Sequence, residues 1–432
     1  MLFYSTKTQS IKASLEEAVF RSLPPDNGLY MPESIPTLSQ DFLQNIEKRS
    51  FNEIAVEVGH NLLSDDISRS EMETIVENSF SFEAPVVEIT PDNYVLELFH
   101  GPSMAFKDFG ARFMASLMSY FLAKTQKEIK ILVATSGDTG GAVARGFYKV
   151  PGISVTILYP SGKVSEIQEK QLTTLGHNIT ALEVDGTFDD CQRLVKEAFL
   201  DQELTAKYNL ASANSINISR LIPQSFYYFS AYAQTKHLGK PLVFSVPSGN
   251  FGNLSAGVLA YRMSLPVQHF VAATNQNNVV PRYLESKAYE PLPSIETISN
   301  AMDVGSPSNF VRLTRFFEDD WQSVRDMVSG YYFDDEATKA SMRKVFEQTH
   351  YVMCPHTAVA YEGLQKYRAE TYGDFTGIFL ATAHPAKFLD LVEKTLDSPV
   401  HIPERLKNLL SLEKTSIPLK PRFQDFKAYL LG

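Results

Sequence analysis

The chain has 432 residues, of which 44% are hydrophobic and 21% are charged, as in an ordinary soluble globular protein of two or three domains. Its formal net charge is −10 and it has no run rich in Lys or Arg, which argues against nucleic acid or an anionic membrane as a main partner. Its two cysteines, Cys191 and Cys354, lie far apart and form no CxxC pattern, which disfavours zinc and a disulfide framework.

The N-terminus carries Lys7, Lys12, Glu16 and Glu17 where a signal peptide would need an apolar core. The longest uncharged run of interest, residues 241–261, contains proline, glycine and asparagine and does not suit a membrane helix. We therefore expect a cytoplasmic protein with no membrane contact.

Taken in chain order, residues 1–85 predict a mostly helical N-terminal region without a strong strand. Residues 93–99 predict a strand, and apolar residues at helical spacing follow over 109–122. Further short apolar strands are predicted with helical segments between them, at 129–134, 153–159, 178–184, 241–246, 269–274 and 376–382. This alternation predicts an α/β fold with mainly parallel sheets flanked by helices, and ligand sites at the carboxyl ends of strands.

The turn after the strand at 241–246 reads VPSGNFGNLSAG and opens a helix rich in small residues. Its backbone N–H groups, at the positive end of a helix, would form a phosphate cup. A purely structural Gly/Asn turn explains the same pattern equally well. The candidate ligands of a phosphate here are Gly249, Asn250, Phe251, Gly252 and Asn253.

A second turn, TSGDTGGA at 135–142, offers the hydroxyls of Ser136 and Thr139 and several amides to an anionic oxygen. Asp138 in this turn either caps the helix or faces a cationic part of a ligand. In SANSINISRLIPQ, Asn214, Ser215 and Arg220 converge if a helix begins near Ser215, and arginine binds phosphate or carboxylate by a forked pair of hydrogen bonds.

A lysine in HGPSMAFKDFGARFM, Lys107, is flanked by Phe106 and Phe109. A buried ammonium group is costly unless it is paired, neutralised or used, so this setting indicates a functional amine. For a lone lysine, the simpler interpretation is a helix-start residue with its head in water. Asp108 is either a helix-start charge or a partner of Lys107.

Motifs of other enzyme classes are missing from the sequence. There is no GxGxxG after a strand, no Walker A loop, no HExxH and no GxSxG. His100, His356 and His384 lie beside conspicuous turns, yet each alone is more often a hydrogen-bonding residue than a catalyst. What remains is two anion-binding turns, a partly desolvated lysine and the strand-end hydroxyl of Thr382. Pyridoxal phosphate needs such a set: a lysine to hold it, a cup for its phosphate and a group facing its ring nitrogen.

In chain order, GPSMAFKD, SGDTGGA, NSINISR, SGNFGN and TAHPAKF resemble the motifs of the threonine synthase family, which belongs to the fold-type-II pyridoxal-phosphate enzymes. DNGLYMPESIP and AMDVGSPSNFVR resemble its longer bacterial and fungal class. The resemblance covers essentially the whole chain.

The resemblance implies a tryptophan-synthase-β-like fold and a lyase that converts O-phosphohomoserine and water to threonine and phosphate. The sequence shows no evident obligate protein partner. It assigns Lys107 to the cofactor, residues 249–253 to its phosphate and Thr382 to its ring nitrogen. It assigns the substrate carboxylate to Thr135, Ser136, Gly137, Asp138 and Thr139, and the substrate phosphate to Asn214, Ser215 and Arg220. It implies an N-terminal extension over 1–85, a cofactor-binding domain over 86–125 and 215–432, and a small mobile domain over 126–214.

Three other functions fit some of these residues. A related phospho-lyase would release a 2-oxo acid, ammonia and phosphate, and the residues alone do not exclude it. A threonine dehydratase needs no substrate-phosphate site, so Arg220 with Asn214 and Ser215 argues against it. A non-catalytic phosphate- or nucleotide-binding protein would need no lysine in a phenylalanine-rich turn.

Overall fold

The computed structural model describes residues 1–125 and 127–432, which form two compact units. Unit 1 comprises Met1, Met31–Phe106 and Leu221–His401. Unit 2 comprises Leu2–Tyr30, Lys107–Arg220 and Ile402–Gly432. The longest of the three segments of unit 2 thus begins at Lys107 and ends at Arg220, both of them predicted site residues. Gln126, the first residue of the predicted small domain, lies outside the described residues. The predicted domain boundaries, and the predicted mobility of the small domain, stay predictions.

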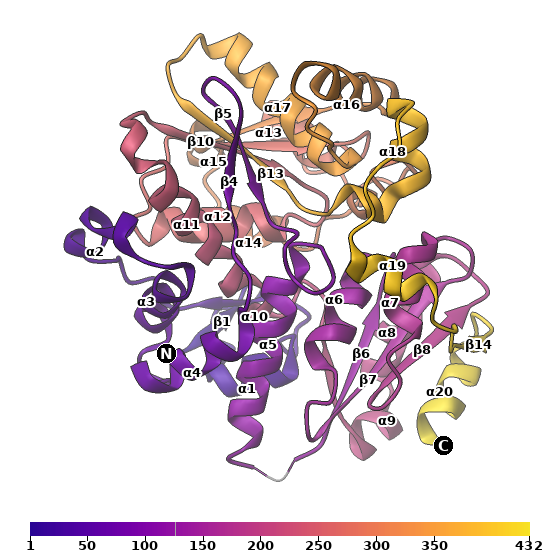
Figure 1. Cartoon of the computed structure of the whole chain (residues 1–432). Helices are drawn as coiled ribbons and strands as arrows, with labels where there is room; N and C mark the ends of the chain where they lie inside the picture. The colour runs from indigo at the N-terminus through magenta and orange to yellow at the C-terminus, as the bar shows by residue number, and fades with distance from the viewer. Residues whose placement is uncertain (126) are drawn as a thin grey trace. The chain divides into compact units, whose positions relative to one another are not determined.

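Unit 1 is built on a six-stranded sheet in the order β12-β11-β10-β13-β5-β4 (Figure 1). All neighbouring strands are parallel except β4, which runs antiparallel to β5 at one edge. Every residue of β10, β11 and β13 is buried, as expected for parallel strands covered on both faces. The strands are β4 (Val86–Thr90), β5 (Asn93–Glu97), β10 (Leu242–Pro247), β11 (His269–Thr274), β12 (Val328–Tyr332) and β13 (Thr376–Ala381).

Helix α17 packs against three strands of this sheet, β10, β11 and β13. Its residues Ala358, Tyr361 and Leu364 join a hydrophobic cluster with Val243 and Phe379 of the sheet. The helices of unit 1 are α2 (Gln40–Gln44), α3 (Phe51–Leu63), α4 (Arg69–Ser79), α11 (Phe226–Thr235), α12 (Gly252–Arg262), α13 (Val279–Ser286), α14 (Phe310–Arg315), α15 (Trp321–Met327), α16 (Asp335–Thr349), α17 (Pro355–Thr371) and α18 (Leu389–Leu396), with 3-10 turns η1 (Ile46–Lys48), η2 (Ile222–Ser225), η3 (Lys236–Leu238), η4 (Asn300–Met302) and η5 (Pro385–Phe388).

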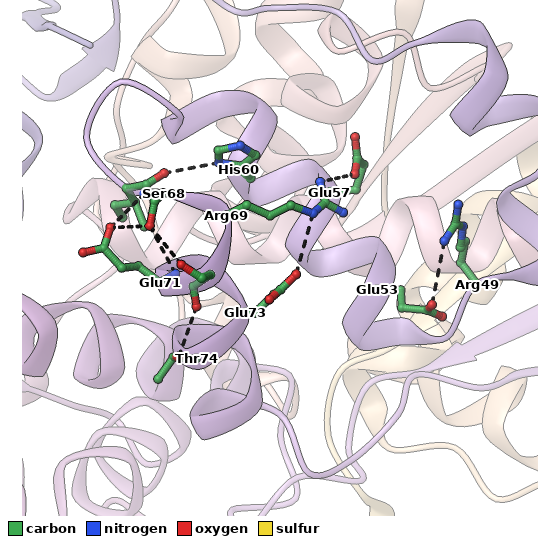
Figure 2. A network of polar contacts seen from close by, with 11 residues as sticks. Arg49, Glu53, Glu57, His60, Ser68, Arg69, Glu71, Glu73 and Thr74 are labelled. Carbon is green, nitrogen blue, oxygen red and sulfur yellow. Dashed lines mark hydrogen bonds and ion pairs between the residues drawn. The ribbon is translucent and has the colours of Figure 1, made fainter.

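The N-terminal helices α3 and α4 both begin with a capping box, as the sequence patterns SFNE and SRSE favour. At α4, the Glu71 carboxylate accepts from the Ser68 backbone N–H at 2.8 Å (Figure 2). Arg69 then joins the two helices, because its Nη1 lies 2.8 Å from Glu57 Oε2 on α3. Such exposed ion pairs contribute at most ~1 kcal/mol, so the caps and the buried faces hold this pair of helices.

Unit 2 contains a five-stranded sheet in the order β14-β8-β7-β6-β9, and all its neighbouring strands are parallel. Leu132, Leu158 and Leu182, on three adjacent strands, share one cluster with α8 and α20. The strands are β6 (Ile129–Ala134), β7 (Ile153–Pro160), β8 (Ile179–Val184), β9 (Asn209–Ser212) and β14 (Ile417–Leu419). A separate three-stranded sheet has the order β2-β1-β3, in which β1 (Phe3–Ser5) runs antiparallel to β2 (Lys12–Ala13).

Helices α5 and α6 lie side by side in unit 2 (Figure 1). A Cβ on Gly146 of α6 would come within 3.0 Å of the Ala111 carbonyl carbon, so the two helix backbones nearly touch. The helices of this unit are α1 (Leu15–Arg21), α5 (Lys107–Leu122), α6 (Asp138–Phe147), α7 (Glu166–Thr173), α8 (Phe188–Leu200), α9 (Gln202–Lys207), α19 (Glu404–Leu410) and α20 (Phe423–Leu431); β3 (Tyr30–Pro32) and α10 (Ile218–Leu221) straddle the unit boundaries in sequence.

The predicted fold class is confirmed: two parallel-type sheets flanked by helices, with a mostly helical N-terminal region. The predicted strands and the helix over 109–122 are present, the latter beginning two residues earlier, at Lys107. Strands β1 to β4, β9, β12 and β14 were not predicted. Of the helices in the part of the chain that is described, none is long and apolar enough to cross a bilayer.

Candidate functional site

The predicted phosphate cup lies between strand β10 and helix α12 in unit 1. Phe251 stands at the N-cap of α12 in the left-handed conformation, with φ 60°. No side chain of the described residues caps this helix. Its first-turn N–H groups are therefore left for an anion, and the helix dipole favours a negative charge there.

Residues 301–309 form the wall behind this cup. A Cβ on Gly249 would lie 2.6 Å from Met302 Cα and 2.9 Å from the Ala301 carbonyl oxygen, so only glycine fits. The Asn250 side-chain oxygen accepts from the Ser308 N–H at 2.5 Å, and its carbonyl oxygen accepts from the Asn309 N–H at 3.2 Å. The segment AMDVGSPSNFVR, which the sequence marked only as a resemblance, thus braces the cup.

Asn253, the last predicted cup residue, uses its side-chain oxygen for hydrogen bonds to two tyrosines. Its Oδ1 accepts from the Tyr227 and Tyr228 hydroxyls at 2.7 and 2.8 Å, and the residue is 6% exposed. Burial raises the pKa of both tyrosines well above the ordinary value, so both hydroxyls stay protonated donors. Its Nδ2 is buried and has no hydrogen-bond partner among the described residues, so Asn253 can meet an anion through this amide as well as through its backbone. No local sequence pattern predicts these contacts with the tyrosines, because the two tyrosines lie on α11, about 25 residues away.

Thr382 directly follows strand β13 and is 7% exposed. Its hydroxyl makes no hydrogen bond to another residue within 1–125 or 127–432, whereas its carbonyl oxygen accepts from the Phe106 N–H at 2.8 Å. A bridge between Ala105 and Ala383 reinforces this link. The segment that leads into Lys107 is thus fastened to the strand end that carries Thr382.

The three histidines noted in the sequence all make hydrogen bonds within the protein. His356 Nε2 accepts from the Ala301 N–H at 3.2 Å, which links helix α17 to the wall of the cup. His384 Nδ1 accepts from the Ala386 N–H at 3.1 Å, and burial lowers the pKa of its ring to about 4. His100 Nε2 lies 2.8 Å from Glu97 Oε2. His384 is therefore neutral near pH 7.

Lys107 is the first residue of α5 in unit 2 and is partly buried. The following residue, Asp108, is completely buried. Its charge acts on the guanidinium groups of Arg112, Arg145 and Arg220. Asp108 lies in the first turn of α5, which agrees with one of its two predicted roles, a helix-start charge. Its charge also acts on arginines of the same unit, which the sequence did not predict.

The turn at 135–139 joins β6 to α6. Thr135 Oγ1 accepts from the Gly137 and Gly140 N–H groups, both at 2.9 Å. Gly137 has φ 135°, and a Cβ there would come within 2.5 Å of Gln168. Asp138 accepts from Gln168 Nε2 at 2.9 Å, so it neither caps α6 through its side chain nor lacks a partner.

Ser136 and Thr139 remain partly exposed in this turn. Neither hydroxyl makes a hydrogen bond to another residue of the described chain. These two side chains can therefore donate to an external anion, as the sequence predicted. Gln168, which holds Asp138 and fills the space beside Gly137, was missed because it lies 30 residues further on, in α7.

The segment 213–220 follows β9, the strand next to β6. Asn214 Nδ2 donates to the Ala134 carbonyl oxygen at 3.0 Å, directly before the 135–139 turn. Arg220 Nη1 donates to the Ala213 carbonyl oxygen. The condition set for their convergence, a helix that begins near Ser215, is not met, because α10 begins at Ile218. Two successive turns, closed by the Asn217 N–H on the Asn214 carbonyl oxygen and the Arg220 N–H on the Asn217 carbonyl oxygen, precede the contact of Arg220 with Ala213 instead.

Arg220 is only 3% exposed. Burial lowers the pKa of its guanidinium to about 10, while the charge of Asp108 opposes that shift, so Arg220 stays charged at neutral pH. Asn217 anchors the segment: its Nδ2 donates to the Val19 carbonyl oxygen at 2.8 Å and to Ser22 Oγ at 3.0 Å. The sequence did not single out Asn217 or Ser22.

The predicted residues thus form two groups. Unit 1 holds the cup at 249–253 and Thr382, and unit 2 holds Lys107, the turn at 135–139, Asn214, Ser215 and Arg220. In unit 2, the 135–139 turn and Asn214 lie at the carboxyl ends of neighbouring parallel strands, where ligands bind in such sheets. Each group by itself suits an anion.

Three family models match the chain. "Pyridoxal-phosphate dependent enzyme" matches residues 90–380, "Threonine synthase N terminus" matches 2–80, and "Threonine synthase, C-terminal" matches 357–430. The threonine synthase of Escherichia coli strain K12 is 43% identical over 421 residues, which cover 97% of this chain and 95% of that protein.

Solved structures give the same result. The crystal structure of the Escherichia coli threonine synthase has a TM-score of 0.93 and 41% identity, and the match covers 100% of this chain and 99% of that one. The structure of threonine synthase from Brucella melitensis with bound PLP has a TM-score of 0.92 and 32% identity, over 100% and 98% of the two chains.

Proposed function

Since this chain belongs to the threonine synthase family of pyridoxal-phosphate-dependent enzymes, we propose that its predicted site residues perform that family's reaction. The overall conversion takes O-phospho-L-homoserine and water to L-threonine and inorganic phosphate. The braced helix start at 249–253, which no described side chain caps, is the observation in this structure that best supports the assignment.

The described residues fit pyridoxal phosphate. The α12 N-terminus offers backbone donors to a phosphate, and Gly249 keeps the approach free of a side chain that Met302 would obstruct. The Thr382 hydroxyl has no partner within the described chain and suits a ring nitrogen. Lys107, partly buried at a helix start, supplies the amine that holds the cofactor.

When bound, pyridoxal phosphate supplies an electron sink that stabilises negative charge next to the substrate amine. The Lys107 amine, when free, takes a proton from the α carbon of the substrate and then one from the β carbon. The bond between the γ carbon and the phosphate oxygen breaks, and phosphate leaves. Water then adds its oxygen at the β carbon, and protons returned to the α and γ carbons complete threonine. One mobile base serves all these positions.

Two groups of residues in unit 2 bind the substrate. Ser136 and Thr139, with the amides of the 135–139 turn, bind the α-carboxylate, for which their exposed hydroxyls are suited. Asn214, Ser215 and Arg220 bind the phosphate. Thr135 and Asp138 act indirectly: Thr135 shapes the turn through two N–H groups, and Asp138 is held by Gln168.

We further propose that residues 126–214 move as a small domain when substrate binds, which excludes water until the addition step. We place the enzyme in the cytoplasm, acting on its small-molecule substrate without an obligate protein partner, in accordance with its composition and charge.

The decisive experiment follows phosphate, threonine and 2-oxo acid together after O-phosphohomoserine is added to the holoenzyme. Equal amounts of phosphate and threonine are expected. Phosphate with a 2-oxo acid and no threonine would identify a phospho-lyase instead. Lys107→Ala should abolish turnover and the visible absorbance of bound cofactor, and normal turnover by this variant would refute the role of Lys107.

A further inference from the structure

Gly110 and Arg220 are in close contact on the first turn of α5. A Cβ on Gly110 would come within 2.7 Å of Arg220 Nε and 2.9 Å of the Arg220 carbonyl oxygen. Atoms this close to a Cβ must shift, and one of the two is backbone. The Arg220 side chain therefore occupies space that any other residue at position 110 would fill.

The same turn of α5 supplies a negative charge. Asp108 is completely buried, and Arg220 is 3% exposed, so each charge needs the other or further partners to offset its desolvation. The charge of Asp108 acts on Arg220. Lys107 and Asp108 are successive residues of α5, and the side chains of successive helix residues leave the helix in different directions.

Two further arginines, Arg112 and Arg145, are influenced by the charge of Asp108. Gly146 packs its backbone against Ala111, and the adjacent residues Arg145 and Arg112 therefore lie near the crossing of α6 and α5. Asp108 acts on both guanidinium groups. The charge of a single buried carboxylate thus acts on three guanidinium groups, and these four groups together carry a net positive charge suited to an anion.

We propose that Gly110 and Asp108 are positioning residues for Arg220: Gly110 leaves the space in which the guanidinium lies, and Asp108 fixes it there by charge, so that it receives the substrate phosphate. The proposal rests on the proposed function, since it takes Arg220 as a phosphate ligand. It gives Asp108 a task that acts through Arg220 and not through Lys107.

The test uses the holoenzyme and inorganic phosphate as the probe. Calorimetry measures the Kd of phosphate, and steady-state assays give KM and kcat for O-phosphohomoserine. For both Gly110→Ala and Asp108→Asn, the Kd and KM should rise about tenfold or more while kcat stays within about threefold, because phosphate recognition and not proton transfer is damaged. The visible absorbance of bound cofactor should stay unchanged.

Gly146→Ala is the matched control, because it adds a methyl group at the α5–α6 crossing without touching Arg220. It should keep the wild-type Kd for phosphate. An equal loss in this control would overturn the proposal, since helix packing alone would then explain the result. Asp108→Glu, which keeps the charge, should recover part of the affinity that Asp108→Asn loses.

Asp108→Asn nearly conserves shape, so it tests the idea even if Gly110→Ala does not fold. Wild-type or tighter phosphate binding by Asp108→Asn would refute the positioning role. A changed cofactor spectrum in this variant would show that Asp108 acts through Lys107, which also refutes it. If the wild-type holoenzyme itself neither bound phosphate nor used O-phosphohomoserine, the proposed function would fail first, and that result is distinct from a failure of the variants alone.

Discussion

The side-chain oxygen of Asn250 accepts a hydrogen bond from the backbone N–H of Ser308 at 2.5 Å. This contact joins the phosphate cup after β10 to a segment almost 60 residues further along the chain. The shape of the cup therefore depends on residues 301–309.

Asn250→Ala removes this acceptor and leaves the Ser308 N–H to solvent. We expect the affinity of the apoprotein for pyridoxal phosphate to fall about five- to tenfold, since one hydrogen bond contributes about 1 kcal/mol. Titration of the visible absorbance measures it. Ser308→Ala is the matched control, because it keeps the backbone donor and should bind cofactor as the wild type does. Equal losses in both variants would contradict the proposed brace.

Gly249→Ala places a methyl group against the backbone of Met302, at 2.6 Å from its Cα. Because backbone on both sides must move, we expect the free energy of unfolding to fall by about 1–3 kcal/mol and cofactor affinity to fall with it. Thermal denaturation of the apoprotein and a cofactor titration check both. Gly373→Ala, at an exposed site whose nearest contact would be Phe375 at 3.3 Å, should change neither.

Gln168→Glu keeps an oxygen for the capping box of α7 but replaces the amide that donates to Asp138 by a carboxylate. Two negative groups then meet beside the 135–139 turn, which costs energy and displaces the turn. We expect KM for the substrate to rise about tenfold, equivalent to about 1.4 kcal/mol. Steady-state kinetics measures KM. The exposed Gln202→Glu is the control, because it adds the same charge away from the turn. An unchanged KM would exclude Gln168 as a determinant of this turn.

Asp303, in the wall of the cup, makes the free energy of unfolding depend on pH. Burial raises the pKa of its carboxyl from 3.8 to about 6, against hydrogen bonds from Thr297 and Asn275 that lower it. The folded protein therefore keeps this proton between pH 3.8 and about 6, where the unfolded chain releases it. The contribution of Asp303 to the free energy of unfolding is thus fully present below pH 3.8 and is lost as the pH rises through 6.

Asp303→Asn removes this titration. The stability of the wild type relative to the variant should fall between about pH 4.5 and pH 7, as measured by urea denaturation at both values. The exposed Asp185→Asn provides the control and should show no such trend. A relative stability of the wild type that rises over this interval would contradict the assignment.

The fold class, and the turns after strands that carry most candidate site residues, could be predicted from the amino-acid sequence alone. Buried parallel strands are continuous apolar runs, and the turns that follow them are rich in glycine, asparagine and hydroxyl residues, so strands such as 129–134 and 269–274 and the helix start at Gly252 could be predicted from local pattern alone. The edge strands β4, β9 and β14 escaped prediction because they are short or have partly exposed residues and lack such a run.

Which side chains remain available to a ligand depends on the packing of elements that are distant in the sequence. Asn253 turns its amide oxygen to Tyr227 and Tyr228, Asp138 is held by Gln168, and Arg220 lies against Gly110. These partners are 25 to more than 100 residues apart along the chain. Periodicity and composition report how a residue meets its own strand or helix, whereas these contacts depend on how separate elements pack, and no local pattern carries that information.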